Sequence, residues 1–352
     1  MNVVKKDDKA AKKILFLANS GLGDTCHVVP VLFALKKKYP FMQFEITFSS
    51  QSAKQLFLLF FPKSIGIIIS EINGIKNMVL QLLKWRKKYF DYVVSGAHLN
   101  SSKTAIIAFC VNAKKSIGIK DEKYSFLYNV RMPAPDHKYF YKRYAALYAY
   151  FGLKSSDIEY GEKRFSEELM KIAQISKNTN LWEKGTSFLV AFANGADSII
   201  RGKWSPSLKR IPESKYAEIF NRIRHNIKSK FIIIGSHKDP FPEEIINSID
   251  VLDLRGNTSI LDLVSVLKKI DLLICNDTGL LHIAHYCSTS YIGIFGPTDS
   301  EQFAPKKNGS KIIQASGSCS KCFPNPECRL NYCRILCSFD VNKILYFVGQ
   351  IF

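Results

Sequence analysis

A carboxylate stands at the expected start of a helix, directly after a short apolar run at residues 13–18. The turn between them contains Gly21 and Gly23, which permit tight turning and a close approach of the backbone to a ligand. Amides at a helix start also attract anions. Asp24 therefore has two interpretations: a general base that takes a proton from an incoming hydroxyl group, or a cap for free helix amides.

This glycine pair is too short to be a nucleotide signature by itself. A dinucleotide fingerprint would have a third glycine where Cys26 stands. A P-loop would continue into Gly-Lys-Ser or Gly-Lys-Thr, which this turn lacks. The turn predicts a ligand-binding edge without specifying the ligand.

A second polar group follows the apolar run at residues 272–275. Asp277, Thr278 and Gly279 lie at this expected strand-to-helix turn, and His282 follows about one turn into the helix. Backbone amides in such a turn suit a pyrophosphate. His282 either faces the same opening or packs the helix against its neighbours.

A third candidate is Lys203, which follows the apolar run at residues 188–193. A lysine at this place can neutralise a phosphate group, and the adjacent Trp204 can pack the loop. The alternative is an ordinary solvated charge.

Five of the nine cysteines lie between residues 319 and 337. Four thiolates suit a tetrahedral zinc or iron ion, so a structural metal is one interpretation, with free thiols and disulfides as the others. Cys319 and Cys322 would be ligands of such a metal, and the choice among Cys328, Cys333 and Cys337 stays open; the candidate set is Cys319, Cys322, Cys328 and Cys337. The polar start of the chain lacks the apolar region of a secretory signal, so we expect a cytoplasmic protein, where disulfides are disfavoured.

These motifs lie in a chain where short apolar runs alternate with helical periods. That alternation is typical of parallel sheets with crossover helices. It predicts an α/β protein with two doubly wound domains facing a central cleft, in which ligands sit at the carboxyl ends of the strands. Strands are expected at 13–18, 44–48, 66–69, 90–94, 188–193, 231–234, 251–254, 272–275 and 291–295, and helices at 25–38, 52–60, 76–88, 103–111, 136–151, 213–227, 243–249, 260–268, 280–286 and 340–350.

The domain organisation follows from a polar, turn-rich stretch near the middle of the chain. We expect an N-terminal domain at 1–175, a linker at 176–186, a second domain at 187–339 that includes the cysteine-rich segment 319–337, and a terminal helix at 340–352.

The chain is strongly basic, with 50 lysines and arginines against 30 acidic residues and a formal charge of +20. Such a field favours nucleic acid, anionic membrane surfaces or phosphorylated substrates. Residues 56–72 are interrupted by Pro62 and fall short of a membrane span, so they predict either a buried helix, turn and strand or a membrane-touching patch. The basic clusters at 36–38 and 86–88 either dock an anionic surface or are solvated helix ends.

The sequence resembles glycosyltransferase family 9, the ADP-heptose:lipopolysaccharide heptosyltransferases of Gram-negative bacteria. The resemblance rests on GLGDTCHVVPVLFAL in the first half and on NDTGLLHIAHYCSTSYIGIFGPTDSEQFAP in the second. It implies the GT-B fold, with two Rossmann-like domains, the acceptor bound by the first and the nucleotide sugar by the second. One departure is Asn194, which stands where the family often has proline.

The resemblance also implies roles for the candidate residues. Asp24 matches the proposed catalytic base, and Ser20, Gly21 and Gly23 belong to its acceptor-side loop. Lys203 matches a phosphate-binding lysine. The residues that match the donor-binding turn are Asp277, Thr278, Gly279 and His282.

The expected activity is an inverting, metal-independent transfer of heptose from ADP-heptose to an inner-core lipopolysaccharide acceptor that carries phosphate or acidic sugars. The absence of an Asp-x-Asp motif agrees with catalysis that needs no metal cofactor. We expect no nucleic-acid partner, and peripheral contact with the cytoplasmic face of the inner membrane. The alternatives are another sugar, a protein acceptor, a non-catalytic nucleotide-sugar-binding module or a nucleic-acid-binding protein.

Overall fold

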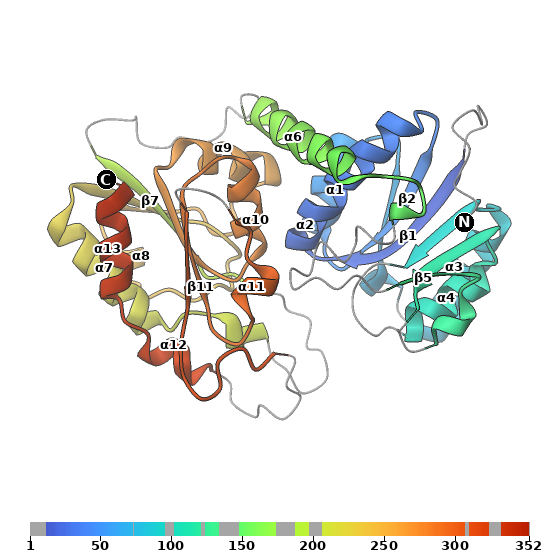
Figure 1. Ribbon diagram of the computed structural model, residues 1–352. Helices are drawn as coiled ribbons and strands as arrows, with labels where there is room; N and C mark the ends of the chain where they lie inside the picture. The colour runs from blue at the N-terminus through green and yellow to red at the C-terminus, as the bar shows by residue number, and fades with distance from the viewer. Residues whose placement is uncertain are drawn as a thin grey trace. The chain divides into compact units, whose positions relative to one another are not determined.

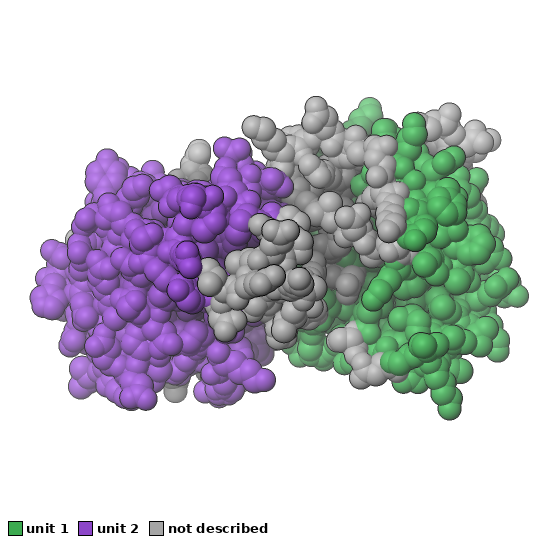
Figure 2. All heavy atoms as spheres, turned by 90° about the horizontal axis from the view of Figure 1, so that it is seen from below, with its two compact units in different colours: residues 1–165 green, residues 166–352 purple. Residues whose placement is uncertain are grey.

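The chain divides into two compact units, residues 1–165 and residues 166–352 (Figure 2). The computed structural model describes residues 12–72, 74–95, 102–120, 124–133, 148–173, 187–196, 206–306, 310–323 and 332–351. The expected linker at 176–186 and most of the expected helix at 136–151 lie outside these residues. The domain boundaries given above therefore stay a prediction.

The described part of unit 1 contains a parallel six-stranded sheet in the order β3-β2-β1-β4-β5-β6 (Figure 1). Its strands are β1 (Lys13–Ser20), β2 (Gln43–Phe48), β3 (Ile65–Ile68), β4 (Tyr92–Ser95), β5 (Lys115–Ile119) and β6 (Val130–Met132). Its helical elements are α1 (Leu22–Lys38), α2 (Gln51–Phe60), η1 (Ile69–Glu71), α3 (Gly74–Lys87), α4 (Ser102–Val111) and η2 (Ser125–Leu127).

Both faces of the unit 1 sheet are covered by helices, which explains why its central strands are apolar throughout. On one face, Leu15 and Leu17 of β1 pack with Trp85 of α3 and Ala108 of α4. On the other face, the ring centroids of Phe16 and Phe44 lie 6.1 Å apart. Phe44 also packs on Phe61 at the C-terminal end of α2, and Phe61 packs on Phe57 within α2. Alternate residues of β1 therefore serve opposite faces.

Residues 56–72 match the interpretation of a buried helix, a turn and a strand. Leu56 and Phe57 in α2 are 0% exposed, and β3 follows after the turn at Pro62. No helix among the described residues is long and apolar enough to cross a membrane.

The described part of unit 2 repeats the same topology, in the order β9-β8-β7-β10-β11-β12 (Figure 1). Its strands are β7 (Phe188–Ala193), β8 (Ser229–Ile233), β9 (Val251–Asp253), β10 (Leu272–Asn276), β11 (Tyr291–Phe295) and β12 (Lys311–Gln314). Its helical elements are η3 (Pro206–Lys209), α7 (Glu213–Asn226), α8 (Glu243–Ile246), α9 (Ile260–Lys269), α10 (Gly279–Tyr286), α11 (Ser300–Phe303), α12 (Arg334–Ser338) and α13 (Asn342–Ile351).

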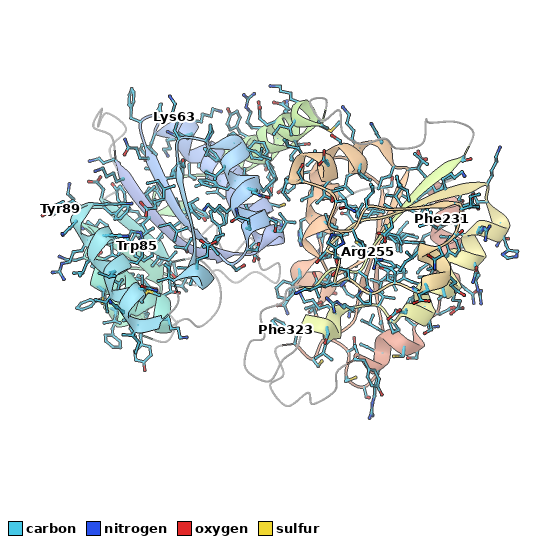
Figure 3. The ribbon with its side chains drawn as sticks, turned by 180° about the vertical axis from the view of Figure 1, so that it is seen from behind. Lys63, Trp85, Tyr89, Phe231, Arg255 and Phe323 are labelled. Carbon is cyan, nitrogen blue, oxygen red and sulfur yellow. The ribbon has the colours of Figure 1, made fainter. Side chains whose placement is uncertain are left out.

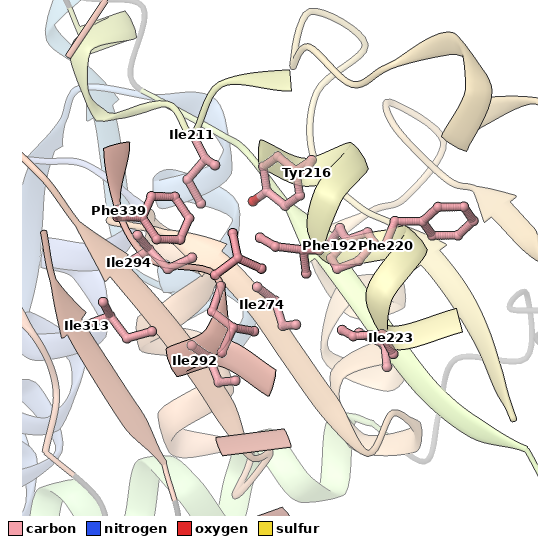
Figure 4. Close-up of a cluster of buried hydrophobic side chains, with 14 of the residues drawn as sticks. Phe192, Ile211, Tyr216, Phe220, Ile223, Ile274, Ile292, Ile294, Ile313 and Phe339 are labelled. Atoms are coloured by element: carbon pink, nitrogen blue, oxygen red, sulfur yellow. The ribbon is translucent and has the colours of Figure 1, made fainter. Parts of the chain in front are cut away.

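The unit 2 core lies between its sheet and helices α7, α12 and α13. Figure 4 shows members of this core from the strands and from α7. Phe192 stacks on Phe231 with ring centroids 5.5 Å apart, and Phe220 meets Phe231 at 4.6 Å. Burial of an aromatic or aliphatic side chain of this size contributes roughly 1.5–3 kcal/mol. On the other face of the sheet, α10 packs against β10 and β11, and α9 packs beside α10.

Read in chain order, each sheet has its strands arranged 3-2-1-4-5-6, the order of the Rossmann fold. The expected α/β class is confirmed. In this arrangement a ligand binds beyond the carboxyl ends of the first and fourth strands, where the strand order reverses. The first and fourth strands of unit 2 are β7 and β10, and those of unit 1 are β1 and β4.

The sequence pattern does not predict several of the helices and strands. They are β5, β6, β12, α12 and α6 (Ser155–Ile172), the helix that contains the division between the two units. In α6, a Cβ atom at Gly161 would lie 1.9 Å from the carbonyl oxygen of Pro30 in α1. Glycine is unfavourable inside a helix, but here Gly161 is the residue that lets α6 approach α1 closely.

Candidate functional site

The candidate donor site in unit 2 lies where β7 and β10 end side by side. Cys275 of β10 pairs with Ala193 of β7, so the residues that follow them emerge at the same edge of the sheet. Asn194 and Gly195 follow β7, and Asp277 follows β10. This is the position at which the Rossmann topology places a ligand.

Asp277 connects three segments at this edge. Its Oδ2 atom lies 2.6 Å from the Lys209 ammonium group and accepts a hydrogen bond of 2.9 Å from the Thr298 hydroxyl group. Lys209 ends η3, and Thr298 follows β11. The carboxylate, which is 8% exposed, therefore holds the loops after β7 and β11 against the turn after β10.

The turn itself opens helix α10. Thr278 is the N-cap residue in an extended conformation, and no capping bond from its side chain is found among the described residues. The first amides of an eight-residue helix thus follow directly after the buried Asp277. A Cβ atom at Gly195 would lie 3.2 Å from Thr278 Oγ1, so the absence of a side chain at Gly195 leaves room beside the turn.

Two asparagines fix the loops behind this turn. The Asn276 side-chain amide donates to the carbonyl oxygens of Gly195 at 2.8 Å and Lys209 at 3.0 Å. Asn194 accepts from the Ile211 amide at 2.8 Å and donates back to the Ile211 carbonyl at 2.9 Å. Proline has no side-chain amide, so Asn194 makes here a loop contact that the proline expected from the resemblance could not make.

His282 lies within α10 and is 3% exposed. The structure therefore places it in the interior of unit 2, and its assignment to the donor site stays a prediction. Lys203 belongs to residues 197–205, which lie outside the described part of the chain, so its phosphate-binding role is likewise a prediction. Lys209, which the sequence reasoning missed, is the described lysine at this edge.

Asp239, in the loop after β8, was also missed. Its Oδ2 atom accepts from the Ser236 amide at 2.7 Å and would lie 3.4 Å from a Cβ atom at Gly195. Burial raises the pKa of Asp239 above its ordinary value, while the Ser236 amide and the Arg210 and Arg255 guanidinium groups oppose that rise. Its place after the second strand of a Rossmann-type sheet was the available signal.

In unit 1, Asp24 lies in the first turn of α1, after β1. Its Oδ2 atom accepts a hydrogen bond of 3.1 Å from the Gly21 amide, and the Thr25 hydroxyl group donates to the Gly21 carbonyl at 2.8 Å. The capping interpretation of Asp24 therefore matches the geometry. A carboxylate that accepts one backbone bond retains acceptor capacity, so capping does not exclude a role as base. Gly23 lies within α1, and the side chain of Ser20 is outside the description.

The described cysteines of the segment 319–337 form no disulfide with one another. Cys319 and Cys337 are exposed, whereas burial, reinforced by the thiols of Cys319 and Cys322, raises the pKa of Cys333 to about 11. Among the described residues, no group of three or more histidine, cysteine or acidic side chains is arranged to hold a metal. Cys328 lies outside the description, so the structure lends the expected four-cysteine metal site no support.

A cavity of about 750 Å³ lies at the other edge of the unit 1 sheet. It is lined by the first residues of three strands, Lys13 of β1, Gln43 of β2 and Ile65 of β3. In parallel sheets this is the edge opposite to the carboxyl ends. The cavity is therefore separate from the turn that carries Asp24.

Comparisons with known proteins agree with this architecture. The family model described as "Glycosyltransferase family 9 (heptosyltransferase)" matches residues 83–332. The lipopolysaccharide core heptosyltransferase OpsX of Haemophilus influenzae is 22% identical over 326 residues, which cover 87% of this chain and 85% of that protein.

Solved structures of low sequence identity show the fold. The family 9 glycosyl transferase from Veillonella parvula DSM 2008 has a TM-score of 0.67 at 14% identity and covers 100% of this chain and 99% of its own. The E. coli heptosyltransferase WaaC with ADP has a TM-score of 0.64 at 15% identity, with 97% of this chain and 100% of its own covered. The GT-B fold is thus confirmed, and because the family match covers more than half of the sequence, this chain belongs to glycosyltransferase family 9, the heptosyltransferases.

Proposed function

We propose that this chain transfers heptose from ADP-heptose to an inner-core lipopolysaccharide acceptor, with inversion at the anomeric carbon and without a metal cofactor. The observation that carries the proposal is the turn of Asp277, Thr278 and Gly279 at the β7–β10 edge of a family 9 chain. The similarity to a heptosyltransferase whose structure contains ADP supports the donor class.

The donor side of the proposal concerns charge on the leaving group. When the bond between the anomeric carbon and the ADP oxygen breaks, negative charge develops on the diphosphate. Lys203 and the amides at the start of α10 would stabilise that charge, and preorganised electrostatics of this kind is commonly the largest catalytic contribution. Asp277 would hold the turn in place through Lys209 and Thr298, and His282 remains in the proposed donor site.

The acceptor side of the proposal concerns a proton. A sugar hydroxyl group is a weak nucleophile near neutral pH, and its oxygen attacks the anomeric carbon more readily when a base removes its proton. Asp24 would accept that proton while its bond to the Gly21 amide holds the carboxylate in position. Ser20, Gly21 and Gly23 would form the loop on this side.

Asp239 adds a donor contact that the sequence reasoning did not contain. In Rossmann-type sheets an acidic residue after the second strand accepts hydrogen bonds from ribose hydroxyl groups. Asp239 has this place in unit 2, close to Gly195 and Thr278. Asp239→Asn should therefore weaken the binding of ADP more than the binding of 2′,3′-dideoxy-ADP. An equal loss of affinity for both nucleotides would show that Asp239 does not contact the ribose.

The proposed acceptor carries phosphate or acidic sugars, and the proposed location is the cytoplasmic side of the inner membrane with peripheral contact. A charge of +20 favours both. Transfer of another sugar, a protein acceptor and a non-catalytic nucleotide-sugar-binding module are the competing functions. We expect no nucleic-acid partner.

A donor screen with the purified full-length chain tests the proposal. ADP-heptose, other ADP-sugars and UDP-sugars are each supplied with core lipopolysaccharide that lacks the heptose, and nucleotide release and product mass are measured. Release of ADP with a heptose-sized increase in acceptor mass is the expected result. Binding of ADP-heptose without turnover would favour the binding module, and turnover with another sugar would replace the donor.

A further inference from the structure

Helix α3 exposes apolar side chains that a globular helix would normally bury. Ile75 is 86% exposed, and Val79, Leu80 and Leu83 are 47%, 47% and 51% exposed. Ile75, Val79 and Leu83 are spaced four residues apart, so they form one stripe along the helix. Since amphipathic helices usually turn such a stripe to the core, its exposure needs a cause.

The opposite side of α3 fixes this orientation. Trp85, labelled in Figure 3, is 0% exposed. Its indole donates to Glu45 Oε1 at 2.6 Å. The Lys88 ammonium group, just after the helix, pairs with Glu45 Oε2 at 2.6 Å. Rolling α3 to hide its stripe would leave the buried Glu45 carboxylate without these partners, which is strongly unfavourable.

Neighbouring elements extend the apolar surface. Helix α4 packs beside α3 (Figure 1) and exposes Ile106 by 48% and Phe109 by 61%, and Phe126 in η2 is 69% exposed. In the described part of unit 2, Ile249 is the one aliphatic or phenylalanine side chain exposed to this degree. We call the exposed side chains of α3, α4 and η2 the α3–α4 surface.

The charge of the α3–α4 surface has one sign. Helix α3 contains four exposed basic residues and α4 one, and neither helix contains an acidic residue. The five are Lys76, Lys84, Arg86, Lys87 and Lys103.

The other basic cluster, at residues 36–38, differs. Its ammonium groups are engaged within unit 1 by the Pro40 carbonyl, the Tyr160 ring and the Gly152 carbonyl. Of the two clusters that the sequence offers for docking, the one at the end of α3 is therefore the better placed.

We propose that the α3–α4 surface docks the enzyme on an anionic lipid membrane, with the apolar side chains in the interfacial region and the basic side chains on lipid phosphates. Exposed apolar residues interleaved with lysine and arginine are the pattern of interfacial membrane binding. A second copy of the chain is a poorer occupant, because a two-fold contact through this surface would oppose like charges. Nucleic acid would use the cations and leave the apolar stripe in water.

This inference rests on the proposed function in that the acceptor is a membrane glycolipid, but the membrane-binding measurement itself uses neither donor nor acceptor. The purified chain is sedimented with vesicles of phosphatidylglycerol and phosphatidylethanolamine, and in parallel with phosphatidylcholine vesicles. The parent should bind the anionic vesicles and lose binding as salt increases. The double variant Val79→Asn/Leu83→Asn should reduce the partition coefficient about tenfold or more, whereas Ile249→Asn, an exposed apolar position in unit 2, should leave it unchanged.

A second double variant tests the contribution of the basic side chains separately from that of the apolar side chains. Lys84→Glu/Lys87→Glu should reduce binding to anionic vesicles by more than about 25-fold, because each basic residue lost near the surface contributes about fivefold and each new glutamate is repelled by the anionic lipid. Lys268→Glu/Lys343→Glu changes the net charge equally at exposed positions of unit 2 and should have a much smaller effect. All variants should transfer heptose to a deacylated acceptor at the parent rate. This control separates a loss of membrane binding from a failure of the proposed function.

Two outcomes would overturn the assignment. Equal binding by both surface variants and the parent would place the membrane contact elsewhere. Loss of self-association on size exclusion in Val79→Asn/Leu83→Asn, with vesicle binding retained, would make the α3–α4 surface an interface between copies of this chain.

Discussion

The Lys209 ammonium group lies 2.6 Å from the Asp277 carboxylate, and the same carboxylate oxygen accepts from the Thr298 hydroxyl group. Asp277 therefore ties together the loops around the candidate donor turn. A residue that the family resemblance assigns to donor binding thus has a positioning role within the folded unit. Its loss should affect both stability and the donor site.

Asp277→Asn should lower the free energy of unfolding by about 2 kcal/mol, because charged hydrogen bonds contribute roughly 1.5–3 kcal/mol and the ion pair between Lys209 and this carboxylate would be lost. Urea denaturation measures this change, and calorimetry should show weaker ADP binding. Asp250→Asn is the control, since Asp250 pairs with Lys230 and Arg224 in a more exposed position and should lose less than about 1 kcal/mol. Equal losses of unfolding free energy in the two variants would show that Asp277 stabilises the unit no more than an exposed ion pair does.

Asp24→Asn should abolish transfer while ADP-heptose affinity stays within about tenfold, because an amide keeps a carbonyl oxygen for the Gly21 amide but cannot take up the acceptor proton. Asp262→Asn in α9 is a matched control. Asp262 also accepts from the backbone amide at the start of its helix, that of Ser259 at 2.9 Å. It should show a similar change in melting temperature with normal turnover. Near-normal turnover by Asp24→Asn would leave the residue as a helix cap alone.

Lys203→Ala should weaken the binding of ADP and of the ADP-sugar by the same factor, because the lost contact is to phosphate. A charge-assisted contact contributes roughly 1.5–3 kcal/mol. Titration calorimetry with both ligands measures the two affinities. Lys343→Ala, at an exposed position of α13, provides the control. If ADP affinity is unchanged in Lys203→Ala, this lysine is a surface charge.

Transfer activity should survive EDTA without added magnesium, because the proposed leaving-group stabilisation uses Lys203 and helix amides. Activity that disappears with EDTA and returns with magnesium would reject the metal-independent mechanism. Metal held by thiolates of the segment 319–337 is a separate question. Elemental analysis of the purified protein, compared between the parent and Cys319→Ser/Cys322→Ser, answers it.

Gly279→Val should remove the protection that ADP gives against thermal unfolding. A branched side chain at the first position of α10 would occupy the space through which a pyrophosphate approaches the amides, and ligand stabilisation depends on affinity for the folded state. Gly349→Val in α13 introduces the same side chain where nothing lies within 4 Å of an added Cβ atom, and ADP protection should persist there. Should Gly279→Val melt earlier without ligand yet gain as much from ADP as the parent, the donor site lies elsewhere.

The sequence by itself determined the α/β architecture and the strand ends at which the candidate sites lie. Strands buried on both faces must be apolar throughout, so the runs at 188–193 and 291–295 predict β7 and β11 with the bounds that the structure has. Because ligands in such sheets bind beyond the carboxyl ends of the strands, Asp24 and Asp277 could be selected as candidates from the residues that follow two apolar runs. The weak or polar elements could not: β6 has three residues, and Gly161 makes α6 look interrupted until its contact with Pro30 is known.

Tertiary structure alone decided which residues meet and which remain exposed. Lys209 pairs with Asp277, and Asp239 comes close to Gly195 and Thr278, because the first, second and fourth strands of unit 2 end at one edge; nothing local in the sequence encodes that meeting. The stripe of Ile75, Val79 and Leu83 looks like a core-facing pattern in the sequence. Its exposure follows from the buried bond between Trp85 and Glu45, because burial depends on neighbours that the fold brings from distant parts of the chain.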